Sequence, residues 1–203
     1  MKILKFFLVF LFLTSRVNAI ELPKIDTKFY LGIYKSFDKL TAGAMQPQSN
    51  FNTPYYTSTD AEKKNLGFFL GYNFYLDNFL LGLETSFQEN IGKDTAVPTF
   101  DGSVTYEKLR EVKFNFGYNY NDFVFFTYLG TGDAHPVWTA YQNDPTFIRE
   151  YWTRGFGIDY KLTENYFIGL NFDETTFDIN YLTSNYVEEV QKQSTRLRFG
   201  YIF

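Results

Sequence analysis

The chain has 203 residues, a net charge of −4, and 25 Phe, 17 Tyr and 2 Trp, but no Cys and a single His, His135. The lack of Cys excludes disulfides and thiolate metal sites, and one His excludes a His-rich metal centre. The negative charge disfavours nucleic acid as a partner, and so many aromatic rings predict a folded rather than a disordered chain.

Residues 1–19 have the pattern of a cleavable signal peptide. A short positive start precedes an apolar run at 6–13, and Ala19 ends a small-x-small cleavage pattern. The run is too short for a membrane-spanning helix, which needs about 20 residues. We therefore expect a signal peptide at 1–19 and one exported domain at 20–203.

The exported part contains eight stretches in which apolar residues alternate with polar or small ones. In the second stretch, for example, Leu66 and Leu70 alternate with Gly67 and Gly71. A period of two is typical of strands with one apolar face. The eight expected strands are residues 27–36, 64–75, 79–88, 112–120, 123–130, 152–160, 166–173 and 196–203.

Short and long connections alternate strictly between these strands. The short ones, at 76–78, 121–122 and 162–165, carry Asp and Asn, which suit tight turns. The long ones are residues 37–63, 89–103, 131–148 and 177–190. All six prolines are expected in these loops or before the first strand, where no ladder hydrogen bond is lost. The pattern predicts an all-β, antiparallel, up-and-down barrel with every long loop at one end.

Two kinds of barrel fit this pattern: a secreted lipocalin-like carrier with an apolar interior, and a transmembrane barrel with an apolar exterior. The polar face is rich in glycine, which suits a narrow interior better than a solvated surface. Aromatic rings bracket every short turn, as in the girdle of a membrane barrel. The predicted girdle is Phe74, Phe79, Tyr120, Phe123, Tyr160, Tyr166, Tyr201 and Phe203. The transmembrane barrel is therefore favoured.

The end of the chain resembles the closing strand of small eight-stranded bacterial outer-membrane β-barrels, close to the opacity-protein-like surface antigens. Leu197, Phe199, Tyr201 and Phe203 occupy the alternate positions of that family's terminal signal. The resemblance implies a location in the bacterial outer membrane, contact with outer-membrane lipid and lipopolysaccharide, and recognition of Phe203 by the barrel-assembly machinery. It also implies periplasmic turns and four long extracellular loops.

The inward face of the expected barrel carries three acids and three bases, which can pair across a narrow interior. They are Glu84, Lys113, Asp159, Asp173, Arg196 and Arg198. Fixed pairs would plug the barrel, whereas pairs that exchange partners would gate a narrow channel for small solutes, and both interpretations remain open. Arg154 falls on the apolar face, and we expect it to reach toward the headgroups.

The long loops are rich in Asn, Thr, Ser, Gln and Tyr, and loops on a rigid scaffold are the usual place for recognition. The leading hypothesis is a surface antigen or adhesion protein, or an envelope-structural role, with host surface molecules as candidate partners. The alternatives are a porin-like gated channel and a lipid-modifying enzyme. Because His135 has no nearby Ser and no nucleophile motif, we expect no catalytic residue, metal or cofactor.

Overall fold

The computed structural model describes residues 24–45, 58–90, 97–99, 102–138, 149–180 and 187–203. The expected signal peptide at 1–19 lies outside them. The strands are β1 (Ile25–Met45), β2 (Ser58–Leu76), β3 (Phe79–Asn90), β4 (Val97–Thr99), β5 (Gly102–Tyr120), β6 (Phe123–Trp138), β7 (Arg149–Lys161), β8 (Tyr166–Asn180) and β9 (Val187–Ile202). Among the described residues, no helix is long and apolar enough to cross a membrane.

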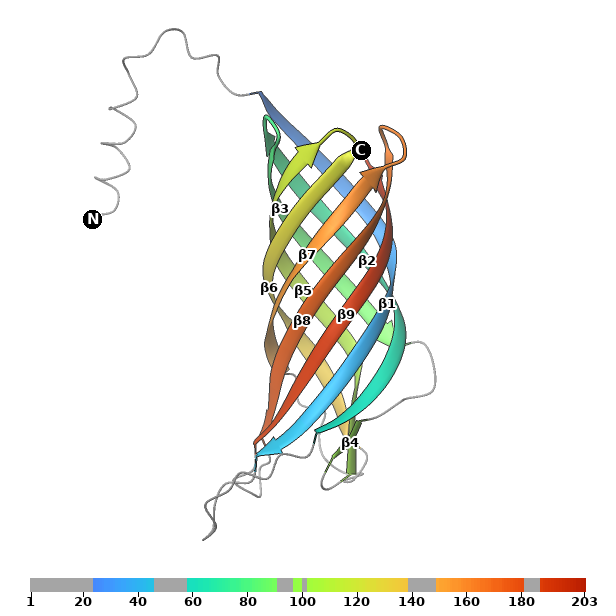
Figure 1. The fold of residues 1–203 in the computed structure, drawn as a ribbon, viewed down its shortest axis with the longest axis vertical. Coiled ribbons are helices and arrows are strands. Elements are labelled where there is room, and N and C mark those ends of the chain that lie inside the picture. The colour runs from blue at the N-terminus through green and yellow to red at the C-terminus, as the bar shows by residue number, and fades with distance from the viewer. Residues whose placement is uncertain (1–23, 46–57, 91–96, 100–101, 139–148, 181–186) are drawn as a thin grey trace, which may run out of the picture.

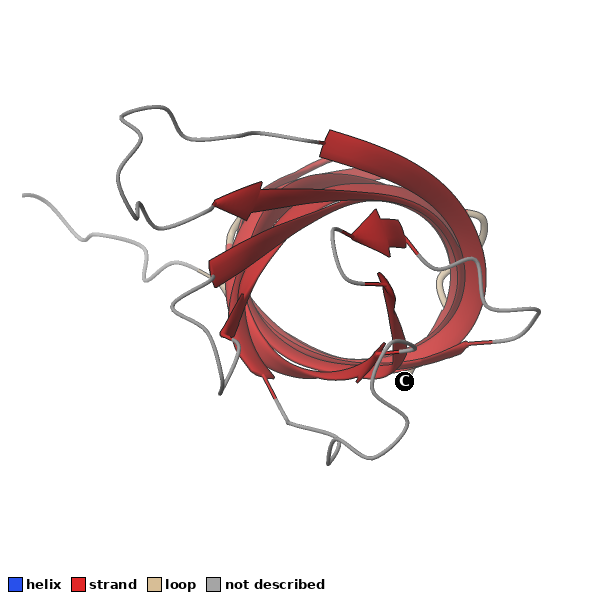
Figure 2. Cartoon of the chain, turned by 90° about the horizontal axis from the view of Figure 1, so that it is seen from below, coloured by secondary structure: helices blue, strands red, loops and turns tan. Residues whose placement is uncertain are grey.

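Eight of these strands form a closed antiparallel barrel, seen from the side in Figure 1 and along its axis in Figure 2. Neighbours in the chain pair with one another, β3 pairs with β5, and β9 pairs back to β1. The short β4 pairs with the start of β5 and also lies close to β1 and β2 at the loop end. The predicted fold, an eight-stranded up-and-down barrel, is confirmed.

The strand register fixes the width of the barrel. A path of direct cross-strand partners leads from Phe37 on β1 around the whole wall and returns to β1 at Thr27, ten positions earlier. Such a stagger tilts the strands and, with eight of them, leaves an interior just wide enough for side chains. The interior is therefore a packed core.

Short turns join the strands at one end. Asp77 and Asn121 have φ angles of 55° and 54°, and Asp and Asn tolerate this left-handed region better than most residues. In the third turn, the hydroxyl of Thr163 accepts hydrogen bonds from the backbone N–H groups of Asn165 and Tyr166 at 3.2 and 3.1 Å. These are the three turns that the sequence predicts.

The two faces of each strand differ sharply in what they contact. Phe68 points outward with 52% of its surface exposed, whereas its neighbour Phe69 points inward with 2% exposed. Leu, Ile, Val, Phe and Tyr, interspersed with Thr, cover the outer wall from the turn end to a border of charged and polar residues such as Lys35, Arg154 and Gln193. A soluble protein does not expose so large an apolar area, whereas the hydrocarbon of a bilayer matches it. A lipocalin-like carrier is therefore excluded.

The predicted strand ends on the loop side were wrong, because the strands continue further. β1 runs on to Met45, and β6 runs on to Trp138. The apolar alternation ends at the first outward charged residues, such as Lys35, but the backbone pairing continues beyond them. Two prolines expected in loops, Pro98 and Pro136, consequently lie in β4 and β6. Pro136 lies beside a bulge in the β5–β6 pairing, where a missing N–H is tolerated.

Candidate functional site: the barrel interior and outer wall

The structure places all six predicted inward charges inside the barrel. They come from β3, β5, β7, β8 and β9, and five of them are buried, while Asp159, nearest the turn end, is partly exposed. They are Glu84, Lys113, Asp159, Asp173, Arg196 and Arg198. They do not form one chain of contacts but two groups, each centred on one arginine of β9.

Arg198 holds the group nearer the turns. Its guanidinium donates a 2.8 Å hydrogen bond to Glu84 and forms an ion pair with Asp159, Nε to Oδ1, at 3.4 Å. The Tyr30 hydroxyl also donates to the Glu84 carboxylate at 3.0 Å. The Arg198 guanidinium lies 4.1 Å from the ring centroid of Phe69, so its face is covered as well as its edges.

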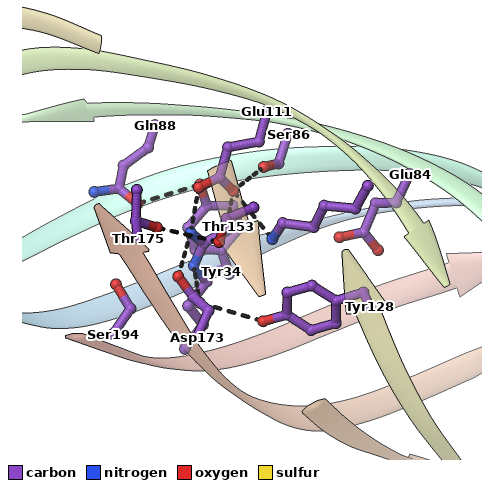
Figure 3. A network of polar contacts seen from close by, with 12 residues as sticks. Tyr34, Glu84, Ser86, Gln88, Glu111, Tyr128, Thr153, Asp173, Thr175 and Ser194 are labelled. Atoms are coloured by element: carbon purple, nitrogen blue, oxygen red, sulfur yellow. Dashed lines mark hydrogen bonds and ion pairs between the residues drawn. The ribbon is translucent and has the colours of Figure 1, made fainter. Parts of the chain in front are cut away.

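Arg196 holds the group nearer the loops. It donates to both oxygens of Glu111, at 2.7 and 2.8 Å, and its Nε lies 3.0 Å from Oδ2 of Asp173. Lys113 and Lys192 add ion pairs to Glu111 and Asp173, at 3.0 and 3.5 Å. Figure 3 shows the two carboxylates facing each other across the interior. Planar guanidinium groups suit such two-pronged pairing with carboxylates.

Four charged residues of the described interior were missed by the sequence analysis: Asp38, Lys63, Glu111 and Lys192. Each lies just beyond an expected strand end, so the alternating pattern was not followed far enough. Glu111, for example, has the same strand parity as Lys113. With these four, the buried charges among the described residues are four acids and five bases, and the partly exposed Asp159, Lys28 and Lys161 lie at the turn end.

Aromatic rings opposite glycines fill the rest of the interior. Seven inward rings each have a glycine as direct cross-strand partner and lie over it, so that a Cβ at that glycine would overlap the ring. The pairs are Tyr30–Gly71, Tyr34–Gly67, Phe69–Gly32, Phe126–Gly157, Tyr128–Gly155, Tyr151–Gly132 and Phe167–Gly200. A cavity of about 10 Å³ remains beside the two arginines, enough for one water.

All eight residues of the predicted girdle lie at the turn end of the outer wall. Six are exposed, while Phe74 and Tyr201 are half-buried. Ring contacts continue from strand to strand, as in Phe29–Phe203, Phe203–Tyr201 and Tyr201–Tyr166, with centroids 5.4, 4.9 and 5.1 Å apart. A belt of rings at this end of the wall suits the interface between acyl chains and headgroups.

Charged residues mark the opposite border of the apolar belt. Arg154, expected to reach toward the headgroups, forms an ion pair with Glu174 of the neighbouring strand at 2.7 Å. It remains largely exposed, with 74% of its side chain accessible. His135, expected in a loop, lies instead in β6. Among the described residues, no group of three or more acids or histidines could hold a metal ion.

No family model and no curated protein matches the sequence. Among solved structures, the chain is similar to the attachment invasion locus protein Ail of Yersinia pestis, with 13% identity, a TM-score of 0.53, and coverage of 87% of this chain and 97% of that one. The fold is that of a bacterial outer-membrane β-barrel. Because its apolar wall requires a bilayer, the predicted location in the bacterial outer membrane is confirmed.

Two further solved structures have weaker likeness to this barrel. The outer membrane protease OmpT of Escherichia coli has 12% identity and a TM-score of 0.42, with coverage of 94% of this chain and 100% of that one. Neisserial surface protein A has 9% identity and a TM-score of 0.39, with coverage of 81% and 95%. At such identities, the activity of a similar protein cannot be transferred to this barrel.

The contact between Tyr30 and Gly71 can be tested by a double-mutant cycle. We expect Gly71→Ala to lower the free energy of unfolding by about 1–3 kcal/mol, because the three atoms nearest to the new methyl group all belong to Tyr30 and overlap it. Tyr30→Ala removes that overlap, so the double variant should be more stable than the sum of the two single losses predicts. Urea titration in lipid vesicles measures all four proteins, and strict additivity would contradict the packing described above.

The Arg196 group can be tested by removing one partner or all three. Arg196→Met leaves Glu111 and Asp173 without their main cation and should cost about 3–5 kcal/mol of unfolding free energy. Adding Glu111→Gln and Asp173→Asn should restore little of this loss, because Lys113 and Lys192 then stay buried without their carboxylate partners. The unfolding midpoint in urea reports both effects. A triple variant as stable as the wild type would show that the buried lysines do not depend on these carboxylates.

Proposed function

We propose that the chain is a non-enzymatic and non-conducting barrel that presents its loop end at the cell surface for attachment or antigenic display. The filled interior carries this proposal. Arg196 and Arg198 each hold carboxylates from different strands, and rings cover the glycines between them. A plug of this kind stiffens the wall and leaves no room for a solute, which favours a scaffold over a channel.

The extended strands support a display function. On β1, the first outward charge is Lys35, yet the strand continues for ten more residues to Met45, roughly 30 Å along its length. On β2, Lys64 is the outward cation at the border of the apolar belt, and the strand begins six residues before it, at Ser58. The paired wall thus projects beyond the apolar belt. Recognition elements are commonly carried on rigid supports of this kind.

The composition of three connecting segments supports recognition of an uncharged surface. Residues 46–57, 139–148 and 181–186 contain one charged residue, Asp144, but five tyrosines and many Asn, Gln, Ser and Thr. Tyr supplies contact area at a low cost in conformational entropy, and small amides and hydroxyls supply adaptable hydrogen bonds. We propose a host surface molecule rich in hydrogen-bonding groups as the partner.

The position of Phe203 supports the proposed recognition by the barrel-assembly machinery. Its ring is on the outer wall with 64% of its surface exposed, and its backbone N–H donates to the carbonyl of Phe29 at 2.9 Å. Before β1 and β9 pair, the same strand edge would be open to another protein. The assembly machinery would then bind the exposed rings of the closing strand and release this strand when β1 pairs with it.

The plug can be tested by conductance in a planar bilayer. We expect no open-channel current from the wild-type protein, because ion pairs and rings occupy the interior. Glu84→Ala should stay silent as well, since Asp159 still pairs with Arg198 and the rings remain in place. Stable unitary currents from the wild type would contradict the plug and favour the gated-channel alternative.

The display function can be tested on whole cells. Replacing residues 46–57 with a Gly-Ser linker of equal length should abolish binding of bacteria that express the barrel to host cells, at unchanged surface amounts. The replacement leaves β1 and β2 intact, since it lies between Met45 and Ser58. The matched control is the same replacement at residues 91–96, which are shorter and include charged residues. Equal binding by wild-type and 46–57 variants would exclude this segment as the contact.

A further inference from the structure

The seam between β1 and β9 closes the barrel and joins residues from the two ends of the chain. Tyr30 of β1 is the direct partner of Ile202 of β9, and the ladder continues to the pair Met45 and Val187. No contact across this seam can form until the last strand is in place. A contact that holds the seam therefore acts on the closed barrel alone.

Two inward glycines face each other in this seam. Gly32 and Gly200 are direct partners, and in the ladders that the structure describes no other two glycines are directly opposed. A Cβ at Gly32 would overlap the carbonyl of Phe199 and the Cα of Gly200, so the two backbones leave no room for a side chain between them. At this level the seam presents bare backbone to the interior.

Rings from the strands on either side cover this bare backbone. Phe69 of β2, the two glycines and Phe167 of β8 are consecutive direct partners in one row across β2, β1, β9 and β8, which lie side by side in Figure 1. Three strand spacings separate Phe69 from Phe167 at the backbone, about 14 Å, yet their ring centroids are 6.1 Å apart. Both rings are buried and lie over the glycines. The rings therefore meet across the seam, and the absence of side chains on the glycines makes this possible.

The closing strand adds a cation to the two rings. The guanidinium of Arg198 lies 4.1 Å from the ring centroid of Phe69 and 5.4 Å from that of Phe167. The Tyr30 ring of β1 lies 6.0 Å from each of these rings, centroid to centroid. Ring–ring and cation–ring attraction both stabilise such a cluster. Its four members come from four strands, two on each side of the seam, so the cluster is complete only when the seam is closed.

We propose that Phe69 and Phe167, meeting over Gly32 and Gly200, form a latch that holds the β1–β9 seam shut from the inside. Opening this seam separates the two rings and exposes the backbone beneath them, while the other ladders can stay paired. Proteins open locally with free energies that depend on the contacts each region must break. The latch adds such contacts at the one seam that strand-to-strand growth of the sheet does not close.

The test measures amide hydrogen exchange of the full-length chain in detergent micelles by NMR. The site variants are F69A and F167A. The matched control is F126A, whose ring lies 5.6 Å from the Arg198 guanidinium but covers Gly157 in the β6–β7 pair, away from the seam. We expect both site variants to exchange the amides that bond across the β1–β9 seam at least tenfold faster than the wild type, with β5–β6 amides within twofold. F126A should leave the seam amides within twofold of the wild type.

Three results would overturn the latch. Seam amides that exchange at the wild-type rate in both site variants would show that the rings do not hold the seam. Equal acceleration of the seam and β5–β6 amides would show a general loss of stability. A seam as loose in F126A as in F69A would show that any lost interior ring has this effect. F69L, which keeps an apolar side chain without a ring, takes the place of F69A if that variant does not fold, and the outcome is independent of the proposed attachment function.

Discussion

The narrow interior is the constraint on which the rest of this structure depends. Eight strands with a ten-residue stagger bring opposite walls so close that inward side chains of distant strands contact one another, as Arg196 of β9 and Glu111 of β5 do. Water cannot fill such a space, so each inward charge needs a protein partner. The two arginines of β9 meet this need by binding carboxylates from β3, β5, β7 and β8, and thereby tie one strand to half of the wall.

An ionic interior is not the only way to fill such a barrel, and buried ion pairs are often no more stable than apolar packing. In a membrane barrel, however, the outer face is already apolar. An apolar interior would make the two faces of each strand alike, and a one-residue slip in register would then cost little. With charges on one face and Leu, Phe and Tyr on the other, a slip would move ions into lipid. We infer that the inward charges specify register as much as they add stability.

The sequence was sufficient for the architecture because the signals for it are local. Strand alternation, Asp and Asn in the turns, and glycine on one face each follow from neighbouring residues. The partners of Arg196 could not be predicted from the sequence, because its contact with Glu111 joins residues 85 positions apart and depends on the register of several strands. The ring-over-glycine pairs were missed for the same reason. The alternation puts Phe69 on the same face as Gly67 and Gly71, but it does not show that the Phe69 ring lies over Gly32 of the neighbouring strand.

The two borders of the apolar belt are built differently, and this difference bears on how the barrel sits in its membrane. At the turn end, rings such as Tyr166 and Phe203 tolerate a range of depths, because they are partly polar or lie among other rings. At the loop end, charges such as Lys35 and Arg154 tolerate no deeper position, because burial in hydrocarbon is costly. The loop-end border therefore sets the depth of the barrel in its membrane.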